Sequence, residues 1–397
     1  MRKIEKLQTP YFLIHKKEID KLVDEMFNSL NKYWRKFIVG YSFKTNNLPW
    51  VITYMKSKGM YAEVVSSDEF NLALELGFQY KNIIFNGPVK GEKEFKRALE
   101  EEGIINLDSK RELRWIAESR NIRARIGLRV NFDIESLCPG ESQCGLEDGR
   151  FGFSYETGEF EKALNELKNL GINISGIHLH CSSKTRSKEI YKAISEMAVK
   201  IVREYKLKLS FVDIGGGFFG GVVGKPTFDE YFLIVNNIFS KEKELKDIEL
   251  IVEPGMSVVG ATMDYVTSVV DEKKTLNNRF ILLDGSRIHI DPLMKKTTYN
   301  YVIEDDSKNR DIIEEKQTLS GFTCMENDRF LTLKNEFLLK ENDKVIFKKV
   351  GAYTIGLSPL FIQFYPDIYV QFEDKVELVQ KRWSEKDFLK NKKEGNK

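Results

Sequence analysis

Three consecutive glycines, Gly215, Gly216 and Gly217, end an alternating apolar run in the segment LSFVDIGGGFFGG. Glycine costs backbone entropy, so a run of three indicates that something must come very close to this backbone. Successive backbone N–H groups without side chains can bind an anion such as phosphate. A tight turn or close strand packing would also need glycine, but three glycines at the end of a strand favour phosphate.

Other reactive side chains also follow short apolar runs. They include an amine, carboxylates, an amide, a guanidinium and two imidazoles, from Lys44, Glu63, Ser66, Asn86, Arg129, His178, His180, Asp213 and Glu253. Each of them alone would more often be a solvated or structural residue. Together with a phosphate site they suggest pyridoxal 5′-phosphate. Lys44 could form a Schiff base with the aldehyde, Glu253 could hold the pyridine proton, and His180 could cover the ring.

The elements that carry these residues alternate between apolar runs and helical patterns. Eight runs begin near residues 39, 61, 82, 104, 124, 174, 209 and 248, separated by segments such as EKEFKRALEEEG and EIYKAISEMAVKIVREY. Eight β/α units with strands rich in Ile and Val predict a closed (β/α)8 barrel of the TIM type; an open doubly wound sheet is the alternative. In such a barrel the active groups lie at the carboxyl ends of the strands, so these residues would share one mouth.

The pattern changes near residue 260. The segments MDYVTSVVDEKK, NRFILLDG, RFLTLKNEF and DKVIFKKVGAYT are typical of strands joined by turns. They predict a β-rich C-terminal domain over 261–397, after a barrel domain over 31–260. Residues 1–30 are predicted to form a strand (PYFLIH) and a helix, with the strand joining the β-rich domain.

The overall composition limits the kinds of partner. The chain of 397 residues has 62 basic and 60 acidic residues, and its net charge of +2 gives no long-range field for nucleic acid or an anionic membrane. A small-molecule substrate is therefore expected. The sequence has no signal-peptide pattern and no apolar run of membrane-spanning length, and its 4 cysteines make no disulfide framework, which predicts a cytoplasmic protein. Cys138 and Cys144 lie close together, but two ligands are at most half of a zinc site.

Seven motifs, in order along nearly the whole chain, resemble those of the fold-type III pyridoxal-phosphate decarboxylases, the group of diaminopimelate and ornithine decarboxylases. They are YSFKTN, EVVSSDE (with Asp68 where glycine is common), HLHCSS, DIGGGF, EPG, GFTC and GAYT. The resemblance implies the Schiff base at Lys44, the pyridine-nitrogen carboxylate at Glu253, and a stacking ring at His180 with Ser183 on the cofactor side.

The same resemblance implies further roles. Additional cofactor contacts are expected from Glu63, Arg129, the three glycines 215–217, Gly255 and Tyr353. The thiol of Cys324 is expected to protonate the α-carbon after an α-amino acid loses CO2. The family also implies a homodimer in which Cys324 reaches the active site of the other subunit.

Two positions expected to meet a carboxylate of the substrate differ from the diaminopimelate enzymes. Met256 follows EPG where those enzymes carry arginine, and DGSRIHIDP has Asp291 before Pro292 where they also carry arginine. Arg287 lies close enough to substitute after a small shift in register. Methionine cannot pair with a carboxylate, so a substrate with a distal carboxylate is not expected.

The position expected to meet a distal amine differs too. Met325 follows Cys324 where the family usually has Asp or Glu, with Glu326 one place later. A methionine cannot hold an ammonium group. The sequence therefore predicts that neither diaminopimelate nor ornithine or lysine is the natural substrate, and the alternative is that Arg287 or Glu326 takes over the missing roles.

Two other functions fit parts of the pattern. His178 and His180 are two apart on a strand, so both side chains point to the same side, as in a metal-dependent hydrolase. However, His15 and His289, the other two histidines of the chain, lie outside the barrel, and no third ligand is evident. A pyridoxal-phosphate racemase of related fold is the second alternative, but a carboxylate at the pyridine nitrogen suits the loss of CO2 better.

Overall fold

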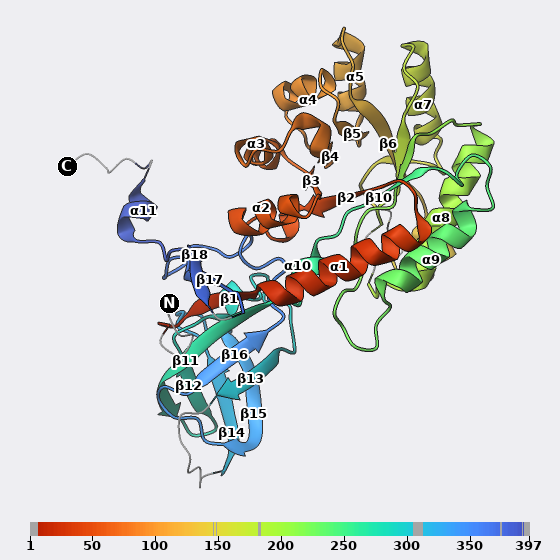
Figure 1. Cartoon of the computed structure of the whole chain (residues 1–397). Helices are drawn as coiled ribbons and strands as arrows, with labels where there is room; N and C mark the ends of the chain where they lie inside the picture. Colours follow the sequence, from red (N-terminus) through yellow and green to blue (C-terminus); the bar gives the residue numbers. More distant parts are fainter. Residues whose placement is uncertain are drawn as a thin grey trace. The chain divides into compact units, whose positions relative to one another are not determined.

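The computed structural model describes residues 7–145, 147, 149–181, 184–304, 313–373, 375–390 and 392. The chain forms two compact units, one of Leu22–Val258 and one of Met1–Lys21 with Val259–Lys397. Figure 1 traces both along the sequence. Among the described residues, no helix is long and apolar enough to cross a membrane.

Eight parallel strands form a closed barrel in the unit Leu22–Val258. They are β2 (Phe37–Ser42), β3 (Tyr61–Val64), β4 (Ile83–Phe85), β5 (Ile104–Leu107), β6 (Arg125–Asn131), β8 (Gly176–His178), β9 (Phe211–Asp213) and β10 (Glu249–Val252). They pair in the order β5-β4-β3-β2-β10-β9-β8-β6, and β5 also pairs with β6. The predicted TIM-type barrel is confirmed, and the open sheet is wrong. A short strand, β7 (Phe153–Ser154), extends β6.

Helices follow the strands and lie outside them in Figure 1. The longer ones are α2 (Pro49–Ser57), α3 (Ser67–Glu75), α4 (Glu92–Leu99), α5 (Lys110–Glu118), α7 (Glu159–Asn169), α8 (Lys188–Glu204) and α9 (Phe228–Phe239). Short turns of helix are η2 (Phe43–Thr45), η3 (Tyr80–Asn82), α6 (Ile134–Leu137) and α10 (Met256–Val259). Local sequence sets their ends: Ser66 Oγ accepts the backbone N–H of Glu69 at the start of α3, and Gly77, with φ of +79°, follows its end.

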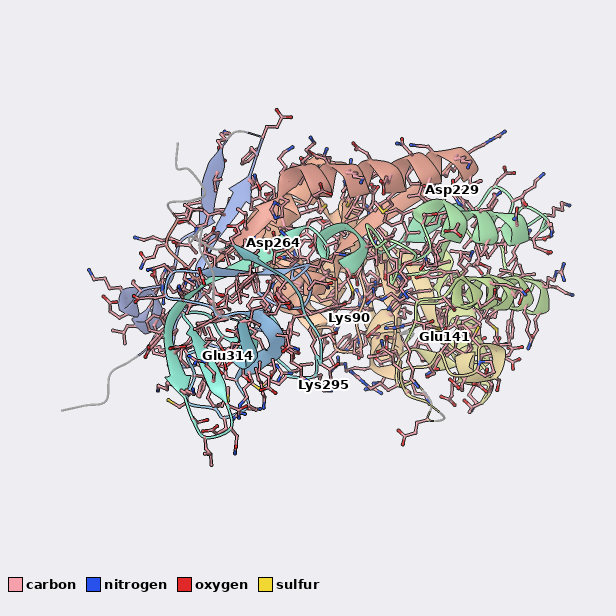
Figure 2. All side chains as sticks on the ribbon, turned by 90° about the horizontal axis from the view of Figure 1, so that it is seen from below. Lys90, Glu141, Asp229, Asp264, Lys295 and Glu314 are labelled. Atoms are coloured by element: carbon pink, nitrogen blue, oxygen red, sulfur yellow. The ribbon has the colours of Figure 1, made fainter. Side chains whose placement is uncertain are left out.

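Helix α1 (Lys16–Tyr33) carries the chain into the barrel unit. At its end, Lys32 Nζ and Tyr33 OH donate to the carboxylate of Asp229 on α9, at 2.9 Å and 3.0 Å. Figure 2 marks Asp229 on that helix. The compact barrel unit includes the part of α1 from Leu22 onward.

The amino ends of the barrel strands are filled by apolar side chains. Ile38, Ile84, Ile104, Phe211 and Ile251 form one buried cluster. The Phe211 ring fits because β8 begins with Gly176, where a Cβ atom would lie 2.3 Å from the ring. With the amino end closed by apolar packing, the polar side chains of the strands collect at the carboxyl end.

The second unit is a sheet of nine strands, which confirms the predicted β-rich domain. The strands are β1 (Tyr11–His15), β11 (Met263–Lys274), β12 (Arg279–Leu283), β13 (Asn300–Glu304), β14 (Ile313–Ser320), β15 (Arg329–Phe337), β16 (Lys344–Lys348), β17 (Asp367–Gln371) and β18 (Val376–Gln380). The main order is β15-β14-β12-β11-β1-β17-β18, and β16 pairs with β11 and β13. A 3₁₀ turn, η4 (Arg287–His289), and helix α11 (Glu385–Leu389) complete this unit.

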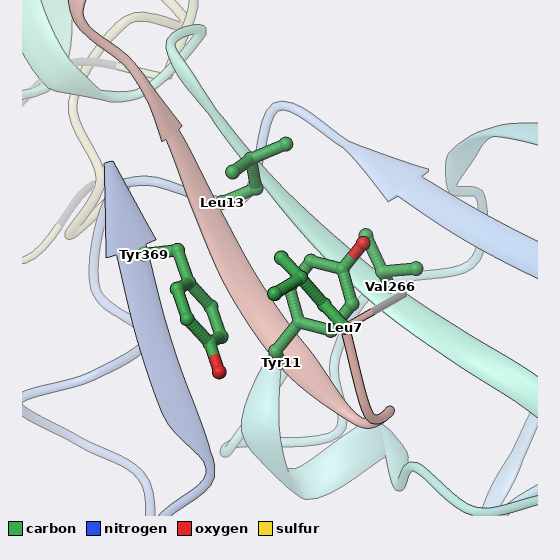
Figure 3. Close-up of a cluster of buried hydrophobic side chains, with 5 residues drawn as sticks. All are labelled: Leu7, Tyr11, Leu13, Val266 and Tyr369. Atoms are coloured by element: carbon green, nitrogen blue, oxygen red, sulfur yellow. The ribbon is translucent and has the colours of Figure 1, made fainter. Parts of the chain in front are cut away.

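Strand β1 lies between β11 and β17 of this sheet, antiparallel to the first and parallel to the second. It is held there by a small apolar cluster, drawn in Figure 3, of Leu7, Tyr11, Leu13, Val266 and Tyr369. The rings of Tyr11 and Tyr369 meet edge to face with centroids 5.5 Å apart.

Candidate active site at the barrel mouth

Lys44 lies in the 3₁₀ turn that follows β2, where its amine is held by two side chains. Its Nζ donates to Ser42 Oγ at 2.7 Å and to Glu63 Oε2 at 2.8 Å. Glu63 is at the end of β3 and its side chain is 1% exposed, whereas that of Lys44 is 39% exposed. The amine is therefore oriented by a buried carboxylate, on a side chain that is itself partly exposed.

A single amide joins this carboxylate to a second one. Asn86, directly after β4, donates from Nδ2 to Glu63 Oε1 at 3.0 Å and to Glu253 Oε1 at 2.5 Å. Glu253 is far from Glu63 and Asn86 in the sequence and lies directly after β10. The residues after β3, β4 and β10 thus form one buried, hydrogen-bonded group.

The group extends across the barrel through a second amide. Asn106 of β5 donates from Nδ2 to Asn86 Oδ1 at 2.9 Å and to Asp213 Oδ2 at 3.1 Å. Burial, followed by the negative charge of Glu253, raises the pKa of Asp213 well above its usual value. The proton affinity of Asp213 is thus raised beside Glu253, because a second negative charge at this buried place would be costly.

Glu253 remains ionised in the same surroundings. Burial opposes its ionisation, but the neighbouring His178 and Lys44 hold the pKa of Glu253 well below its usual value. His178 Nε2 lies 3.6 Å from Glu253 Oε2, which is too far for a direct hydrogen bond, so this contact is electrostatic. The mouth thus contains two neighbouring carboxyl groups whose pKa values are shifted in opposite directions.

His180 presents a flat, neutral ring at the mouth. The rings of His178 and His180 are 6.3 Å apart and nearly parallel, at 14°, although β8 ends at His178 and His180 lies two residues beyond the strand on which it was predicted. Burial lowers the pKa of His180 to about 3, so the imidazole is uncharged at neutral pH. The backbone N–H of Gly216 donates to His180 Nδ1 at 3.2 Å, which leaves the ring proton on Nε2.

The structure gives each of the three glycines a reason within the chain. Gly215 and Gly217 have φ of +68° and +93°. A Cβ at Gly215 would lie 2.3 Å from the His180 ring, and one at Gly216 would lie 2.0 Å from the backbone oxygen of Glu253. The N–H of Gly215 donates to Asp213 Oδ1 at 2.9 Å. Turn and packing therefore give each of the three glycines a role within the chain, and the phosphate contact that they favour stays a prediction.

Arg129, at the end of β6, is fixed by an acid that the sequence analysis did not select. Its NH1 donates to Asp108 Oδ2 at 2.9 Å, and its guanidinium lies over the Phe151 ring at 4.7 Å. Among the described residues, the buried Nε of Arg129 has no hydrogen-bond partner. The guanidinium is thus held in place with a donor to spare.

The structure also contains a buried ion pair that the sequence did not reveal. Lys90, whose place in the barrel unit is marked in Figure 2, has its Nζ 3.1 Å from Glu112 Oε2, and both side chains are 0% exposed. Lys90 also donates to the backbone oxygens of Gly87 and Asn106, at 2.8 Å and 3.0 Å. Burial lowers the pKa of Lys90 and raises that of Glu112. Its contacts tie the loop after β4 to β5, which is a structural role.

Two other predicted positions belong to this unit. A Cβ at Gly255 would lie 2.1 Å from Thr45 Oγ1, so glycine lets the turn after β10 approach the turn that carries Lys44. Met256 begins α10 and is half-buried. Ser183 lies outside the described residues.

The remaining predicted positions lie in the β-rich unit, on loops. Cys324 is exposed in the turn between β14 and β15, and Tyr353, after β16, is 39% exposed with φ of +56°. Asp328 organises these loops: it accepts from Ser286 Oγ at 2.9 Å and from Thr323 Oγ1 at 2.7 Å. The DGSR and GFTC segments are therefore neighbours.

The charged candidates on these loops are already paired. Arg287 donates from Nε and NH2 to Asp291 Oδ2, at 3.0 Å and 2.8 Å. Glu326 accepts from Arg329 NH2 at 2.9 Å, and its side chain is 96% exposed. Met325, which directly precedes Glu326, is half-buried. The two residues that might replace the missing substrate contacts thus have partners of their own.

The metal-site alternative needs one correction. The sequence analysis paired His178 with His180 and found no third ligand, whereas the structure groups His178 with Asp213 and Glu253, all buried, with ligand atoms within 4.8 Å of one another. His180 is not part of this group. The spacing of the two histidines therefore arranges stacked rings and not two ligands of one ion.

The donor set suits pyridoxal phosphate. It offers a partly exposed amine for the aldehyde, an ionised buried carboxylate for a protonated ring nitrogen, a neutral flat ring, and a glycine turn whose third residue, Gly217, has open space at its Cβ position apart from Tyr191 OH at 3.4 Å.

Known proteins resemble this chain over most of its length. The family described as "Pyridoxal-dependent decarboxylase, pyridoxal binding domain" matches residues 18–260. The diaminopimelate decarboxylase of Helicobacter pylori is 27% identical, over 98% of this chain and 96% of that protein. Among solved structures, the diaminopimelate decarboxylase from M. jannaschi has a TM-score of 0.86 at 22% identity, covering 98% of this chain and 93% of the other. The H. pylori enzyme complexed with L-lysine has a TM-score of 0.82 at 24% identity, covering 97% of each chain.

Proposed function

This chain belongs to the pyridoxal-dependent decarboxylase family, and we propose that its barrel mouth binds pyridoxal 5′-phosphate through Lys44 and removes the α-carboxylate of an amino acid. Family membership confirms the resemblance seen in the seven motifs. The observation that carries the proposal is the ionised, buried carboxylate of Glu253 at the same mouth as the partly exposed amine of Lys44.

The residues of the mouth divide the work by their chemistry. When bound, the cofactor supplies an electron sink for the electron pair released as CO2 departs. Glu253 holds a proton at the ring nitrogen by its negative charge, which favours decarboxylation over the racemase alternative. Glu63 and Ser42 keep the Lys44 amine in position. The neutral ring of His180 covers one face without adding a charge.

The proton for the product comes, in this proposal, from Cys324. The thiol is exposed on its loop, beside the loop of Arg287. We expect it to act on the site of a second copy of the chain, within a homodimer, and to protonate the α-carbon. Tyr353, also on a loop of this unit, is expected to contact the phosphate.

The proposed substrate has a far end that carries less charge than diaminopimelate, ornithine or lysine. Met256 and Met325 offer neither charge nor hydrogen-bond donor to such groups. Arg287 is paired with Asp291, so part of its charge and of its hydrogen-bonding capacity is already engaged within the loop. Diaminopimelate decarboxylases are nevertheless among the relatives, so the substrate is the part of the proposal that most needs measurement.

Borohydride reduction of the protein loaded with pyridoxal phosphate tests the cofactor assignment. The label should be recovered by mass spectrometry on the peptide of Lys44, and recovery on another lysine would show that this assignment is wrong. Product analysis then separates the reactions, because a decarboxylase releases CO2 and an amine whereas a racemase returns the opposite enantiomer.

A substrate panel tests the specificity. Diaminopimelate, ornithine, lysine and arginine should each give kcat/KM below about 10⁴ M⁻¹s⁻¹, the low end for typical enzymes. A neutral-ended amino acid in a wider panel should exceed them. A higher value for any of the four would place the protein among enzymes of ordinary specificity.

A further inference from the structure

We propose that Asn86 is a positioning residue that fixes two carboxylates at once: Glu63, which holds Lys44, and Glu253, the partner of the ring nitrogen. Through this amide the charge at one carboxylate is coupled to the charge at the other. The roles of Lys44 and Glu253 toward the cofactor rest on the proposed function, whereas the coupling itself is a property of the protein alone.

The geometry uses both hydrogens of one amide nitrogen. Asn86 Nδ2 lies 3.0 Å from Glu63 Oε1 and 2.5 Å from Glu253 Oε1. An asparagine amide nitrogen has two hydrogens, so each carboxylate receives one. All three residues are buried, with exposed fractions of 3% for Asn86, 1% for Glu63 and 5% for Glu253, so water cannot easily replace these bonds.

The amide cannot turn over, because a second amide fixes its oxygen. Asn106 Nδ2 donates to Asn86 Oδ1 at 2.9 Å, so the Asn86 oxygen faces away from the carboxylates. Asn106 itself is held by its bond to Asp213 and by lack of space on the other side: a Cβ at Gly127 would lie 2.0 Å from Asn106 Oδ1. Asn106 thus fixes the orientation of the Asn86 amide, whose nitrogen donates to both Glu63 and Glu253.

Each carboxylate keeps its other oxygen for a different group. Glu63 Oε2 accepts from Lys44 and Ser42, at 2.8 Å and 2.5 Å. Glu253 Oε2 lies 3.6 Å from His178 Nε2. The charged or titratable groups that face this pair or act on it are Lys44, Glu69, His178, His180 and Asp213.

Removing the amide should change the protonation of the pair. Two buried carboxylates without their shared donor repel each other, and the form in which one of them is protonated becomes favoured. If Glu253 takes the proton, the ring nitrogen loses its anion. If Glu63 takes it, Lys44 loses its partner. Asn86→Leu, which has nearly the same size and no polar atoms, produces this state.

The sign of the effect on stability follows from linkage. A glutamate in the unfolded chain has a pKa of about 4.3. In the variant, the folded protein would keep a proton above that pH, so its stability is present at low pH and is lost as pH rises through the raised folded pKa. The melting temperature of Asn86→Leu should therefore fall further below that of wild type at pH 8 than at pH 5, by about 2–4 °C for each unit of raised pKa.

A matched control separates coupling from simple loss of packing. Ser195 on α8 is also 0% exposed, and its hydroxyl donates to the backbone oxygen of Tyr191 at 2.6 Å. Ser195→Ala removes a buried hydrogen bond without touching a carboxylate, so its deficit in melting temperature should be the same at pH 5 and pH 8. In the double variant Asn86→Leu/Glu63→Gln, Glu253 is the only carboxylate of the pair that remains. The pH-dependent part of the deficit in melting temperature should then disappear.

The experiment has two readouts, neither of which is turnover. The first is the melting temperature of the full chain without added cofactor, for wild type, Asn86→Leu, the double variant and Ser195→Ala between pH 5 and pH 8. The second is the absorbance of the bound cofactor during a pH titration, whose midpoint should shift by at least about one unit in Asn86→Leu. If Asn86→Leu does not fold, Asn86→Ser, which keeps one donor, should show a smaller change of the same sign.

The proposal is overturned if the deficit in melting temperature of Asn86→Leu, like that of Ser195→Ala, is the same at every pH and the absorbance midpoint of the bound cofactor is unchanged. Failure of wild type to bind pyridoxal phosphate would instead overturn the proposed function. The melting experiment would still decide whether Asn86 couples the two carboxylates, because it needs no cofactor.

Discussion

At the barrel mouth, Glu63, Glu253 and Asp213 are buried and joined by side-chain hydrogen bonds, whereas in the β-rich unit Cys324 and Tyr353 are exposed on loops. The first group depends on six strands of one closed sheet, since its members follow or belong to β2, β3, β4, β5, β9 and β10. The second depends on turns stabilised by local bonds. A change at the mouth must therefore disturb a shared network, while a change on the loops need not disturb the barrel.

This difference separates two tasks of the proposed enzyme. The groups that would hold the cofactor and control its charge belong to the rigid network. The groups that would choose the substrate and deliver a proton belong to the loops around Asp328, where residue types can vary without cost to the barrel strands. Of the three positions that differ from the family motifs, Met325 and Asp291 lie on these loops, whereas Met256 begins α10 in the barrel unit.

Lys44→Ala should have the largest effect. The variant loses both the covalent attachment of the cofactor and the amine that accepts and returns protons, so decarboxylation should fall at least ~10³-fold. The measurement is CO2 release at saturating cofactor. Lys96→Ala, which removes a lysine paired with Glu92 and Glu118 on the surface, should stay near wild type. A loss of less than tenfold in Lys44→Ala would show that another amine does the chemistry.

Glu253→Gln should come next. The neutral amide keeps the shape but removes the charge opposite the ring nitrogen, and loss of one such electrostatic contact costs about 10²–10³-fold in turnover. Cofactor binding, followed by absorbance, should survive because Lys44 is intact. Glu242→Gln, at a surface pair with Arg203, is the control. Turnover close to wild type in Glu253→Gln would assign the role to another acid.

Cys324→Ala tests the loop side of the comparison. Removal of a general acid should lower turnover about 10²-fold, and because Cys324 is exposed the melting temperature should hardly change. Mixing Cys324→Ala with Lys44→Ala chains should restore up to about a quarter of the wild-type activity, since half of the random dimers would have one intact site. No recovery, together with an active monomer, would contradict the shared site.

The part of this molecule that sequence predicts well is the part set by local pattern. Apolar runs, either alternating with period 2 or continuous in Ile and Val, predicted all eight barrel strands. Residues just after these strands, such as Lys44 and Glu253, were therefore expected at one mouth of the barrel. The strands of the β-rich unit were found only in part, since β13, β14, β17 and β18 were missed. β13, β14 and β18 carry exposed residues that hide the alternation, and β17 is a short run of five residues.

What sequence could not supply is contact between distant residues. The bonds that Asn86 makes to Glu253 and receives from Asn106 depend on the register of parallel strands, which no local pattern encodes. Lys90 reads as a solvated lysine, and only the fold reveals that it is buried against Glu112. The sequence shows Arg287 and Asp291 close together, but only the turn η4 explains why their side chains meet as an ion pair.

The smallest expected effect concerns that loop pair. Asp291 is buried and accepts from Arg287, from Tyr299 OH at 3.0 Å and from the backbone of Lys295 and Lys296. Asp291→Asn keeps the size of the side chain and removes its charge, so Arg287 loses its ion-pair partner and becomes available to a carboxylate. If Arg287 faces the substrate, kcat/KM for diaminopimelate should rise about two- to fivefold, the value of a partly exposed ion pair, while that for ornithine, which has no distal carboxylate, stays the same.

The double variant Asp291→Asn/Arg287→Gln is the control and should lose the gain. An equal rise for both substrates, or none for diaminopimelate, would show that Arg287 only holds its loop together and that the loops of the β-rich unit select the substrate through other residues.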